Sequence, residues 1–331
     1  MSDRESLIKD FLSRHGWGEA QRGTLAGDAS FRRYDRLSLN GEKAVLMDAP
    51  PPQEDVRPFL RIARHLDSLG YSAPKILAAD ETLGFLLLED LGDDTFTRLL
   101  AHGEDEEDLY WLAVDMLIDL HGKGDVGIPT GLPLYDDDKL LTEAMLLVDW
   151  YYPEVMGQPI PPAMRDHYAA LWRDIFPTMR MVPETMVLRD FHVDNLMRLA
   201  RPGLAACGLL DFQDAVAGPI TYDLMSLLED ARRDIDPLMI EGLKRRYLDA
   251  FPALDPVRFD ASWAAMAAQR HAKVIGIFTR LMRRDGKPFY LQHISRVWRL
   301  LERALSRPEL AALRHWLNAA IPPEKRVVPT P

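Results

Sequence analysis

The apolar positions of the first 91 residues predict a small sheet accompanied by single helices. Apolar residues recur with helical spacing within residues 6–15 and again within residues 57–69, which end at Gly70. The Asn40-Gly41 pair is a strong hairpin signal, because both residue types accept the positive φ angles of a tight turn. Antiparallel strands are expected from four short runs, at residues 31–39, 44–47, 75–79 and 85–89.

After Leu91-Gly92 the pattern becomes helical. Residues 104–121 begin with acidic side chains and carry an apolar stripe, as an amphipathic helix does. Further helices are expected at residues 139–150, 163–176, 222–233, 238–251, 261–284, 291–306 and 310–319. The fold class is therefore α+β, with a sheet lobe at residues 1–91, a larger helical lobe at residues 92–331, and a ligand expected in the cleft between them.

Composition and charge exclude several classes of function. The chain has 331 residues and a formal net charge of -11, which argues against nucleic-acid binding because phosphates require a basic surface. No run of about 18 apolar residues predicts a membrane span, and the polar residues 1–9 do not resemble a secretory signal. Cys207 is the single cysteine, which excludes a disulfide within one chain. We expect a cytoplasmic protein.

The chemically informative segment runs from Val187 to Phe212. Within it, Asp190 lies in a polar loop, Asn195 follows five residues later, and Asp211 ends an apolar run. If residues 195–199 and 207–211 pair about a turn near Gly203, Asn195 lies opposite Asp211. An amide oxygen beside a carboxylate suits magnesium, and phosphoryl transfer also needs a carboxylate that accepts the proton of the attacking hydroxyl.

Each of these polar residues is also common in turns and helix caps. The combination of Asp190, Asn195 and Asp211 around one predicted hairpin favours a functional site over three separate turn residues. We interpret His192, between them, as a structural residue that bonds the loop backbone.

The motif Asp190-x-His192-x-x-Asn195, followed by Leu-Leu-Asp211-Phe, resembles the catalytic and metal-binding motifs of the aminoglycoside phosphotransferase family. The resemblance implies a protein-kinase-like, two-lobe fold and an ATP-dependent small-molecule kinase. It assigns Asp190 as the base, and Asn195 and Asp211 as magnesium ligands. The segment Leu86–Leu91 resembles the hinge between the lobes, so Glu89 and Leu91 are expected to contact the adenine.

Three further segments, at 27–34, 47–51 and 269–278, are similar to those of bacterial kinases that phosphorylate the anomeric hydroxyl of N-acetylmuramic acid and N-acetylglucosamine in cell-wall recycling. This narrower resemblance implies an amino-sugar acceptor. An aminoglycoside, a choline-like compound or another alcohol is the alternative acceptor.

The ATP phosphates are expected near a turn formed by Gly27, Asp28, Ala29 and Ser30, which is either a phosphate-covering loop or a plain hairpin turn. Met47 stands where the family has a strand lysine, so Arg32, Arg33 or Lys43 is expected to replace that lysine. Arg32 and Arg33 alternate along a strand, and therefore at most one of them faces the cleft. The missing lysine also leaves a nucleotide-binding pseudokinase as an alternative.

The acceptor is expected beside Asp190, with Arg189, Trp150 and Arg270 as its further contacts. Trp150 begins an aromatic run that is either a sugar platform or part of the core. Leu188-Arg189 replaces the His-Gly pair that the family has before the base. Asp223 is interpreted as a helix cap that supports the loop.

Overall fold

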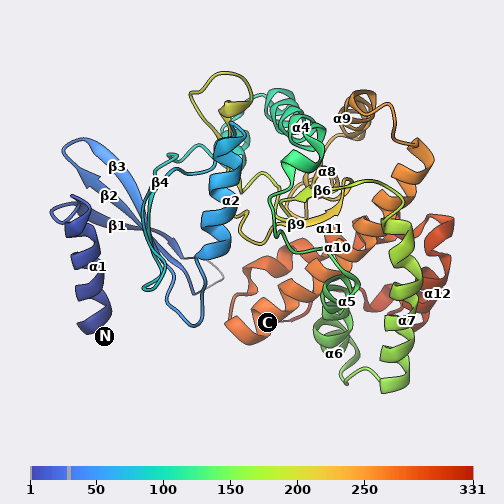
Figure 1. The fold of residues 1–331 in the computed structure, drawn as a ribbon. Helices are drawn as coiled ribbons and strands as arrows, with labels where there is room; N and C mark the ends of the chain where they lie inside the picture. Colours follow the sequence, from blue (N-terminus) through green and yellow to red (C-terminus); the bar gives the residue numbers. More distant parts are fainter. Residues whose placement is uncertain (1, 28–30, 331) are drawn as a thin grey trace. The chain divides into compact units, whose positions relative to one another are not determined.

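The computed structural model describes residues 2–27 and 31–330 (Figure 1). The chain divides into two compact units, each made of two segments. The first unit comprises Met1–Met116 and Val193–Ala215, and the second comprises Leu117–His192 and Val216–Pro331. The first contains a five-stranded antiparallel sheet and the second is mainly helical, which confirms the α+β class. The lobe boundary at residue 91 stays a prediction.

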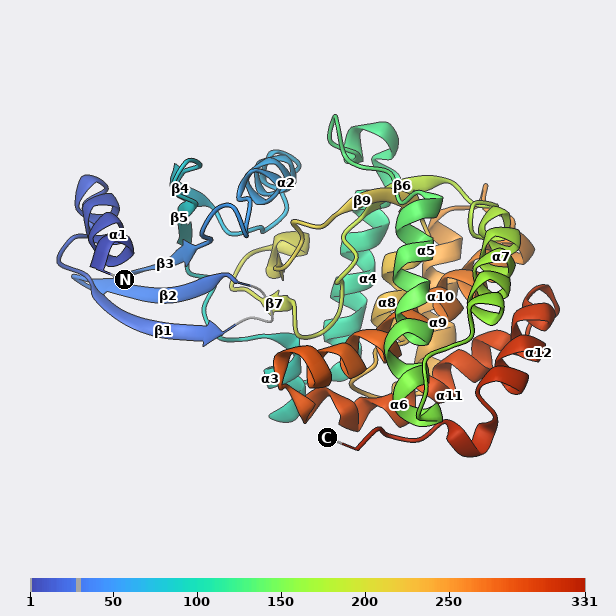
Figure 2. The same cartoon turned by 90° about the horizontal axis from the view of Figure 1, so that it is seen from below.

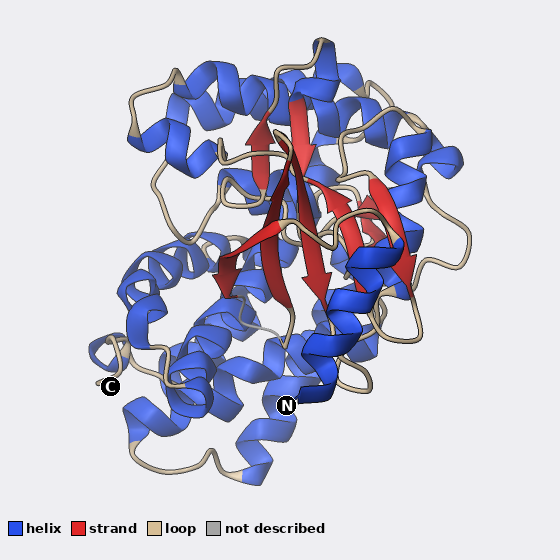
Figure 3. Ribbon diagram, turned by 90° about the vertical axis from the view of Figure 1, so that its left-hand side faces the viewer, coloured by secondary structure: helices blue, strands red, loops and turns tan. Residues whose placement is uncertain are grey.

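The sheet of the first unit has the strand order β1-β2-β3-β5-β4. Its strands, drawn in red in Figure 3, are β1 (Gln21–Gly27), β2 (Arg33–Leu39), β3 (Glu42–Asp48), β4 (Ile76–Asp80) and β5 (Phe85–Glu89). Asn40 and Gly41 form the predicted turn between β2 and β3, with φ angles of 51° and 88°. The four predicted runs are confirmed. Strand β1 lies outside them because its sequence, QRGTLAG, has one β-branched residue and no aromatic residue.

Helix α1 (Ser2–Arg14) packs on one face of this sheet, as Figures 1 and 3 show. The shared core consists of Ile8, Phe11, Leu12, Leu37, Ala44, Leu46, Phe85 and Leu87. Successive strand residues point to opposite faces, so Tyr34, Val45 and Leu88 lie on the other face. We call these two surfaces the helix face and the pocket face.

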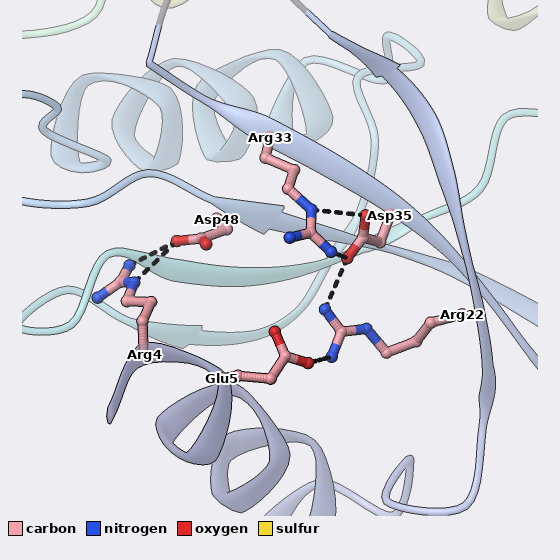
Figure 4. Close-up of polar contacts among 6 residues, drawn as sticks. All are labelled: Arg4, Glu5, Arg22, Arg33, Asp35 and Asp48. Atoms are coloured by element: carbon pink, nitrogen blue, oxygen red, sulfur yellow. Dashed lines mark hydrogen bonds and ion pairs between the residues drawn. The ribbon is translucent and has the colours of Figure 1, made fainter. Parts of the chain in front are cut away.

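Two ion pairs fasten α1 to the sheet, Arg4 with Asp48 and Glu5 with Arg22, and Asp35 and Arg33 extend the second of them (Figure 4). Arg22 joins Glu5 of α1 to Asp35 of β2, and its distance to the Asp35 carboxylate is 2.7 Å. Arg33 donates to the same carboxylate at 3.0 and 2.7 Å. Burial raises the pKa of Asp35, but the bonds from Arg33 and Arg22 outweigh burial, so the net pKa is lowered and Asp35 remains ionised.

A second hairpin in the first unit carries part of the predicted site. It consists of β7 (Leu196–Arg198), the 3-10 turn η3 (Gly203–Ala206) and β8 (Cys207–Leu209). Leu196 pairs with Leu209, and the Leu210 N–H donates to the Asn195 carbonyl at 2.9 Å. Asn195 therefore lies opposite Leu210, and the register predicted from the sequence is wrong by one residue. The unit also contains α2 (Arg57–Ser68) and α3 (Phe96–Ala101), while α4 (Glu106–Gly122) starts there and ends in the second unit.

Helices form most of the second unit (Figure 2). They are α5 (Asp137–Leu146), the π-helical turn η2 (Leu147–Tyr151), α6 (Tyr152–Met156), α7 (Pro162–Met179), α8 (Tyr222–Leu228), α9 (Pro237–Ala250), α10 (Pro256–Asp285), α11 (Ile294–Leu305) and α12 (Ala311–Ala320). Short 3-10 turns occur at η1 (Gly124–Gly127), η4 (Pro288–His293), η5 (Pro308–Leu310) and η6 (Pro323–Lys325). Strands β6 (Glu184–Val187) and β9 (Val216–Pro219) pair antiparallel.

The predicted helices of this unit are confirmed, with two informative differences at their ends. Helix α10 starts before the predicted 261, because the Asp255 carboxylate caps it by accepting from the Val257 N–H at 2.8 Å. Helix α8 ends at Leu228 rather than at 233, because Glu229 leaves helical geometry and its buried carboxylate binds Trp263 and His271 of α10.

Helix α10 lies at the centre of the second unit and contacts α5, η2, α7, α8 and α11. Gly276 of α10 permits the close approach of α10 to the end of α5. A Cβ atom at residue 276 would lie 2.3 Å from the carbonyl carbon of Leu146, at the end of α5. The absence of a side chain at Gly276 therefore sets how close α10 and α5 come.

Gly276→Ala should destabilise the protein by about 1–3 kcal/mol, because the added methyl group forces α10 and α5 apart. Gly242 of α9 provides the matched control, since a Cβ there meets nothing within 4 Å. Gly242→Ala should stabilise by about 0.5–1 kcal/mol through helix propensity alone. Chemical unfolding of both variants tests the difference; equal changes in the free energy of unfolding would contradict this account of the helix contact.

Candidate active site

The first unit contains a pocket of about 550 Å³, a size typical of small-molecule sites. Its apolar wall includes Val45 and Leu88 from the pocket face of the sheet and Met197 from β7. Asn195 and Asp211 line its polar part. The pocket therefore offers an apolar surface for a ring and oxygen-bearing side chains for a charged group.

Asn195 and Asp211 lie side by side, as predicted, although not through the predicted register. The Asn195 Nδ2 is 3.4 Å from the Asp211 Oδ2, and the Gln213 Nε2 donates to the other carboxylate oxygen at 2.6 Å. Asp211 has a φ angle of 57°, in the left-handed region, so the chain bends sharply at this residue. The following Phe212 is buried and packs on Phe59 of α2 with ring centroids 4.9 Å apart, which anchors the bend.

This donor pair fits magnesium, which prefers carboxylate and amide oxygens and completes its shell with water and phosphate oxygens. Binding requires Asn195 to present its amide oxygen, which is a rotation about the terminal side-chain torsion. Across the described ranges 2–27 and 31–330, no cluster of three or more His, Cys, Asp and Glu side chains is arranged to hold a metal.

The predicted hinge residues Glu89 and Leu91 both line the pocket. The Glu89 carboxylate pairs with Arg201 of the β7–β8 turn at 2.5 Å, and Arg201 also donates to the Ser72 hydroxyl at 2.8 Å. The side chain of Glu89 therefore ties β5 to the hairpin, and a role for Glu89 and Leu91 in adenine binding depends on their backbone groups.

The predicted phosphate loop, residues 27–30, lies only partly within the described residues. Gly27 ends β1 opposite Arg33, whereas Asp28, Ala29 and Ser30 lie outside the described residues. Arg33 bonds Asp35 on the helix face, which argues against a role for Arg33 at the pocket. Arg32 pairs with Glu54 at 3.1 Å, and Met47, at the position of the family's lysine, is buried.

In the second unit, the loop that carries Asp190 is held by the carboxylate of Asp223. This carboxylate accepts the N–H of Leu188 at 2.6 Å and the N–H of Arg189 at 2.9 Å. Arg189 has a φ angle of 72°. The interpretation of Asp223 as a helix cap is wrong, because its carboxylate accepts both bonds from N–H groups of the loop, and α8 has no side-chain cap. Its predicted support of the loop is confirmed.

Asp190 is half-buried and surrounded by cations. Burial raises its pKa, but the positive charges of Lys273 and Arg270 outweigh burial, so the net pKa is lowered and Asp190 is a carboxylate at neutral pH. Arg270 donates to the Arg189 carbonyl at 3.2 Å and to the Tyr222 hydroxyl at 3.0 Å. Arg270 therefore braces the loop, and its predicted contact with the acceptor stays a prediction.

His192 and Trp150 are both at least half-buried. Burial lowers the pKa of His192 to about 4, so its imidazole is neutral at pH 7, and its bond to the loop backbone stays a prediction. Trp150 is half-buried in η2, and the neighbouring Tyr151 is fully buried against Trp298 with ring centroids 5.5 Å apart. The aromatic run thus belongs largely to the core, and sugar binding by Trp150 stays a prediction.

Glu143 was not predicted as part of the site, although its carboxylate forms ion pairs with Arg189 and Lys273. The sequence does contain a signal for its burial. Glu143 shares a helical stripe with Leu140 and Ala144, and a charged residue on an apolar stripe indicates a buried ion pair.

Comparison with known proteins agrees with this site. A family model described as the phosphotransferase enzyme family matches residues 23–259, and the chain therefore belongs to that family of small-molecule phosphotransferases. The N-acetylmuramate/N-acetylglucosamine kinase of Caulobacter vibrioides is 36% identical, covering 98% of this chain and 99% of that protein. The enzyme of the same name from Pseudomonas aeruginosa is 39% identical, covering 96% of this chain and 94% of that protein.

A solved structure agrees at the level of the fold. The GDP complex of aminoglycoside 2'-phosphotransferase-IIIa has a TM-score of 0.61 and 14% identity, covering 92% of this chain and 99% of that one. This likeness confirms the predicted protein-kinase-like fold. The family match and the two near-full-length relatives confirm the prediction of a small-molecule kinase, and kinases of this family use a nucleoside triphosphate as the phosphoryl donor. Across the described residues, none of the helices has the length and apolarity needed to cross a bilayer.

Asp223→Asn should reduce stability by an amount that depends on pH. Burial raises the pKa of Asp223 to about 7, so the folded protein binds more protons than the unfolded chain between about pH 4 and 7, and this carboxyl costs stability as the pH rises. Asparagine removes that cost. The deficit of the variant should be largest near pH 4–5 and shrink towards pH 8, as measured by thermal unfolding across pH. A constant deficit would contradict the raised pKa.

Proposed function

We propose that this chain transfers the γ-phosphoryl group of ATP to the anomeric hydroxyl of N-acetylmuramic acid and N-acetylglucosamine. One observation carries the proposal: Asn195 and Asp211 lie together in a pocket with an apolar wall, and Asn195 follows an ionised Asp190 by five residues along the chain. The two near-full-length amino-sugar kinases support the choice of acceptor.

Asp190 acts as the base in this proposal. Its carboxylate orients the acceptor hydroxyl and takes the proton as the oxygen bonds to the γ-phosphorus and the bond to the β-phosphate oxygen breaks. The lowered pKa of Asp190 keeps its carboxylate ionised at neutral pH, so the carboxylate is able to accept this proton. Asp223 and Arg270 keep the loop in place through bonds to its backbone.

The nucleotide occupies the pocket of the first unit. The adenine ring lies between the apolar side chains of Val45, Leu88 and Met197, and the phosphates lie towards Asn195 and Asp211. Magnesium, held by Asn195 and Asp211, would neutralise the phosphate charge when bound. Arg32, fixed by Glu54, is the candidate for the role of the strand lysine that Met47 cannot fill.

The acceptor site is built around Asp190 with Arg189, Trp150 and Arg270. The chain between Asp190 and Asn195 spans at most about 18 Å when fully extended. The acceptor hydroxyl and the phosphates are therefore bound by neighbouring parts of one short segment.

Purified protein with Mg-ATP should phosphorylate N-acetylmuramic acid and N-acetylglucosamine at the anomeric position, and Asp190→Asn should lose about two to four decades of turnover. Coupled ADP release measures the rate and ³¹P NMR identifies the phosphorylated position. Nucleotide affinity, measured by calorimetry, is the control and should be unchanged in the variant. Wild-type turnover in Asp190→Asn would reject the assigned base.

The acceptor panel also decides between the alternatives. It contains an aminoglycoside and choline beside the two sugars, and GTP replaces ATP in a parallel series. Transfer to the aminoglycoside or choline without sugar turnover would overturn the proposed acceptor. Nucleotide binding without transfer to any acceptor would indicate a pseudokinase.

Asp211→Asn should raise the magnesium concentration needed for half-maximal activity by about tenfold or more, because one charged ligand is lost. Asp214, exposed and three residues further along, provides the matched control. Asp214→Asn should leave the magnesium dependence unchanged. Identical magnesium titrations for both variants would remove Asp211 from the proposed metal site.

A further inference from the structure

Four side chains converge on the carboxylate of Glu143 in α5, which is 8% exposed. Arg189 and Tyr135 donate to its two oxygens. Lys273 Nζ lies 3.3 Å from Oε1, and Gln269 Nε2 donates to Oε2 at 3.2 Å. All of these residues belong to the second unit. Glu143 is therefore the centre of a buried polar network that joins α5, α10 and the loop carrying Asp190.

Arg189 brings this network next to the proposed base. It precedes Asp190 directly, and its φ angle of 72° is a strained conformation for any residue except glycine. Strain of this kind persists where the surroundings hold it in place. Asp223 holds the backbone of Arg189, and Glu143 holds its guanidinium group. The Glu143 contact thus fixes where a cation adjacent to Asp190 points.

The charges in this region do not cancel in pairs. Glu143 contributes one negative charge and faces two cations, Arg189 and Lys273. Burial raises the pKa of Glu143, but Lys273 and Arg189 outweigh burial, so the net pKa is lowered and Glu143 stays ionised. The charged and titratable groups that face Asp190 are Arg189 and His192 on its own loop, Arg270 and Lys273 on α10, and Asp223 on α8.

We propose that Glu143 is a positioning residue for phosphoryl transfer, which binds Arg189 and Lys273 and so limits the positive charge that these two cations exert on Asp190. The inference rests on the proposed function, in which Asp190 receives the proton of the acceptor. With Glu143 in place, the carboxylate of Asp190 stays directed to the acceptor hydroxyl. Without its charge, Asp190 is left to compensate both cations and becomes a weaker base.

Glu143→Gln keeps the shape of the side chain and removes its charge. The variant should lose between about 10- and 100-fold in kcat, the scale of a misplaced reacting group, with little change in KM for ATP. The acid limb of the kcat profile should move down by about one pH unit, because uncompensated cations lower the pKa of Asp190 further.

Glu229→Gln is the matched control. Glu229 is also a buried carboxylate that binds α10, through Trp263 at 2.8 Å and His271 at 2.8 Å. Glu229→Gln should lower the melting temperature, as should Glu143→Gln, and should leave the acid limb where it is in the wild type. An equal shift of the limb in both variants would contradict a specific role for Glu143.

Two further substitutions test the direction of the effect. Lys273→Met removes one cation and should move the acid limb upward, opposite to Glu143→Gln. Arg189→Gly removes the other cation and accepts the positive φ angle without strain. The shift caused by Glu143→Gln should therefore be smaller in the Arg189→Gly background. An unmoved limb in Lys273→Met, and the same shift in both backgrounds, would overturn the inference.

The titration of Asp190 can also be measured without turnover. Carboxyl ¹³C NMR, with Asp190→Asn for assignment, should show a lower pKa for Asp190 in Glu143→Gln than in the wild type. If the wild type transfers phosphate and this pKa does not move, the role of Glu143 fails while the proposed function stands. If the wild type transfers nothing but the pKa moves, the proposed function fails while the coupling of Glu143 to Asp190 stands.

Discussion

One buried carboxylate, that of Asp223, sets the backbone on which the chemistry of the second unit depends. It accepts two successive N–H groups, those of Leu188 and Arg189, which would otherwise be buried without partners at the end of β6. Arg270 satisfies the Arg189 carbonyl from the other side. The N–H groups and the Arg189 carbonyl of this segment are thus bound by side chains of α8 and α10. The loop therefore keeps a backbone conformation that its own residues do not favour, and this conformation fixes the position of Asp190.

In the first unit, an unfavourable backbone conformation is likewise held in place, here by side-chain packing as well as by charge. Asp211 bends the chain in the left-handed region, and the bend is held by Phe212 against α2. The other end of the β7–β8 hairpin is tied to β5 by the pair formed by Arg201 and Glu89. A pocket lined by short segments thus acquires rigid walls, and rigid walls favour the precise binding of a ligand. In both units, a non-glycine residue with positive φ marks the place where side chains override local backbone preference.

Much of this arrangement follows from the sequence, and the exceptions have physical causes. Helical periodicity locates the long helices because their buried faces are continuous, and the motif of Asp190, Asn195 and Asp211 identifies the candidate site. The hairpin register could not be predicted, because it depends on the length of η3 rather than on any strand residue. Strand alternation predicts that Arg32 and Arg33 face opposite ways, but only the position of α1 decides that Arg33 lies on the helix face. The contacts of Asp223 with Leu188 and Arg189, and of Glu143 with Arg189, join residues more than 30 positions apart, beyond the reach of local patterns.

The division of the chain has a consequence for dissecting this protein. The first unit is built from two separate stretches, and the polypeptide passes from one unit to the other after residues 116, 192 and 215. A fragment that stops at residue 116 would retain the five-stranded sheet but lack Asn195, Met197 and Asp211, and with them one wall of the pocket. The first unit therefore cannot be expressed as a simple truncation; it requires residues 193–215 to be grafted back through a linker.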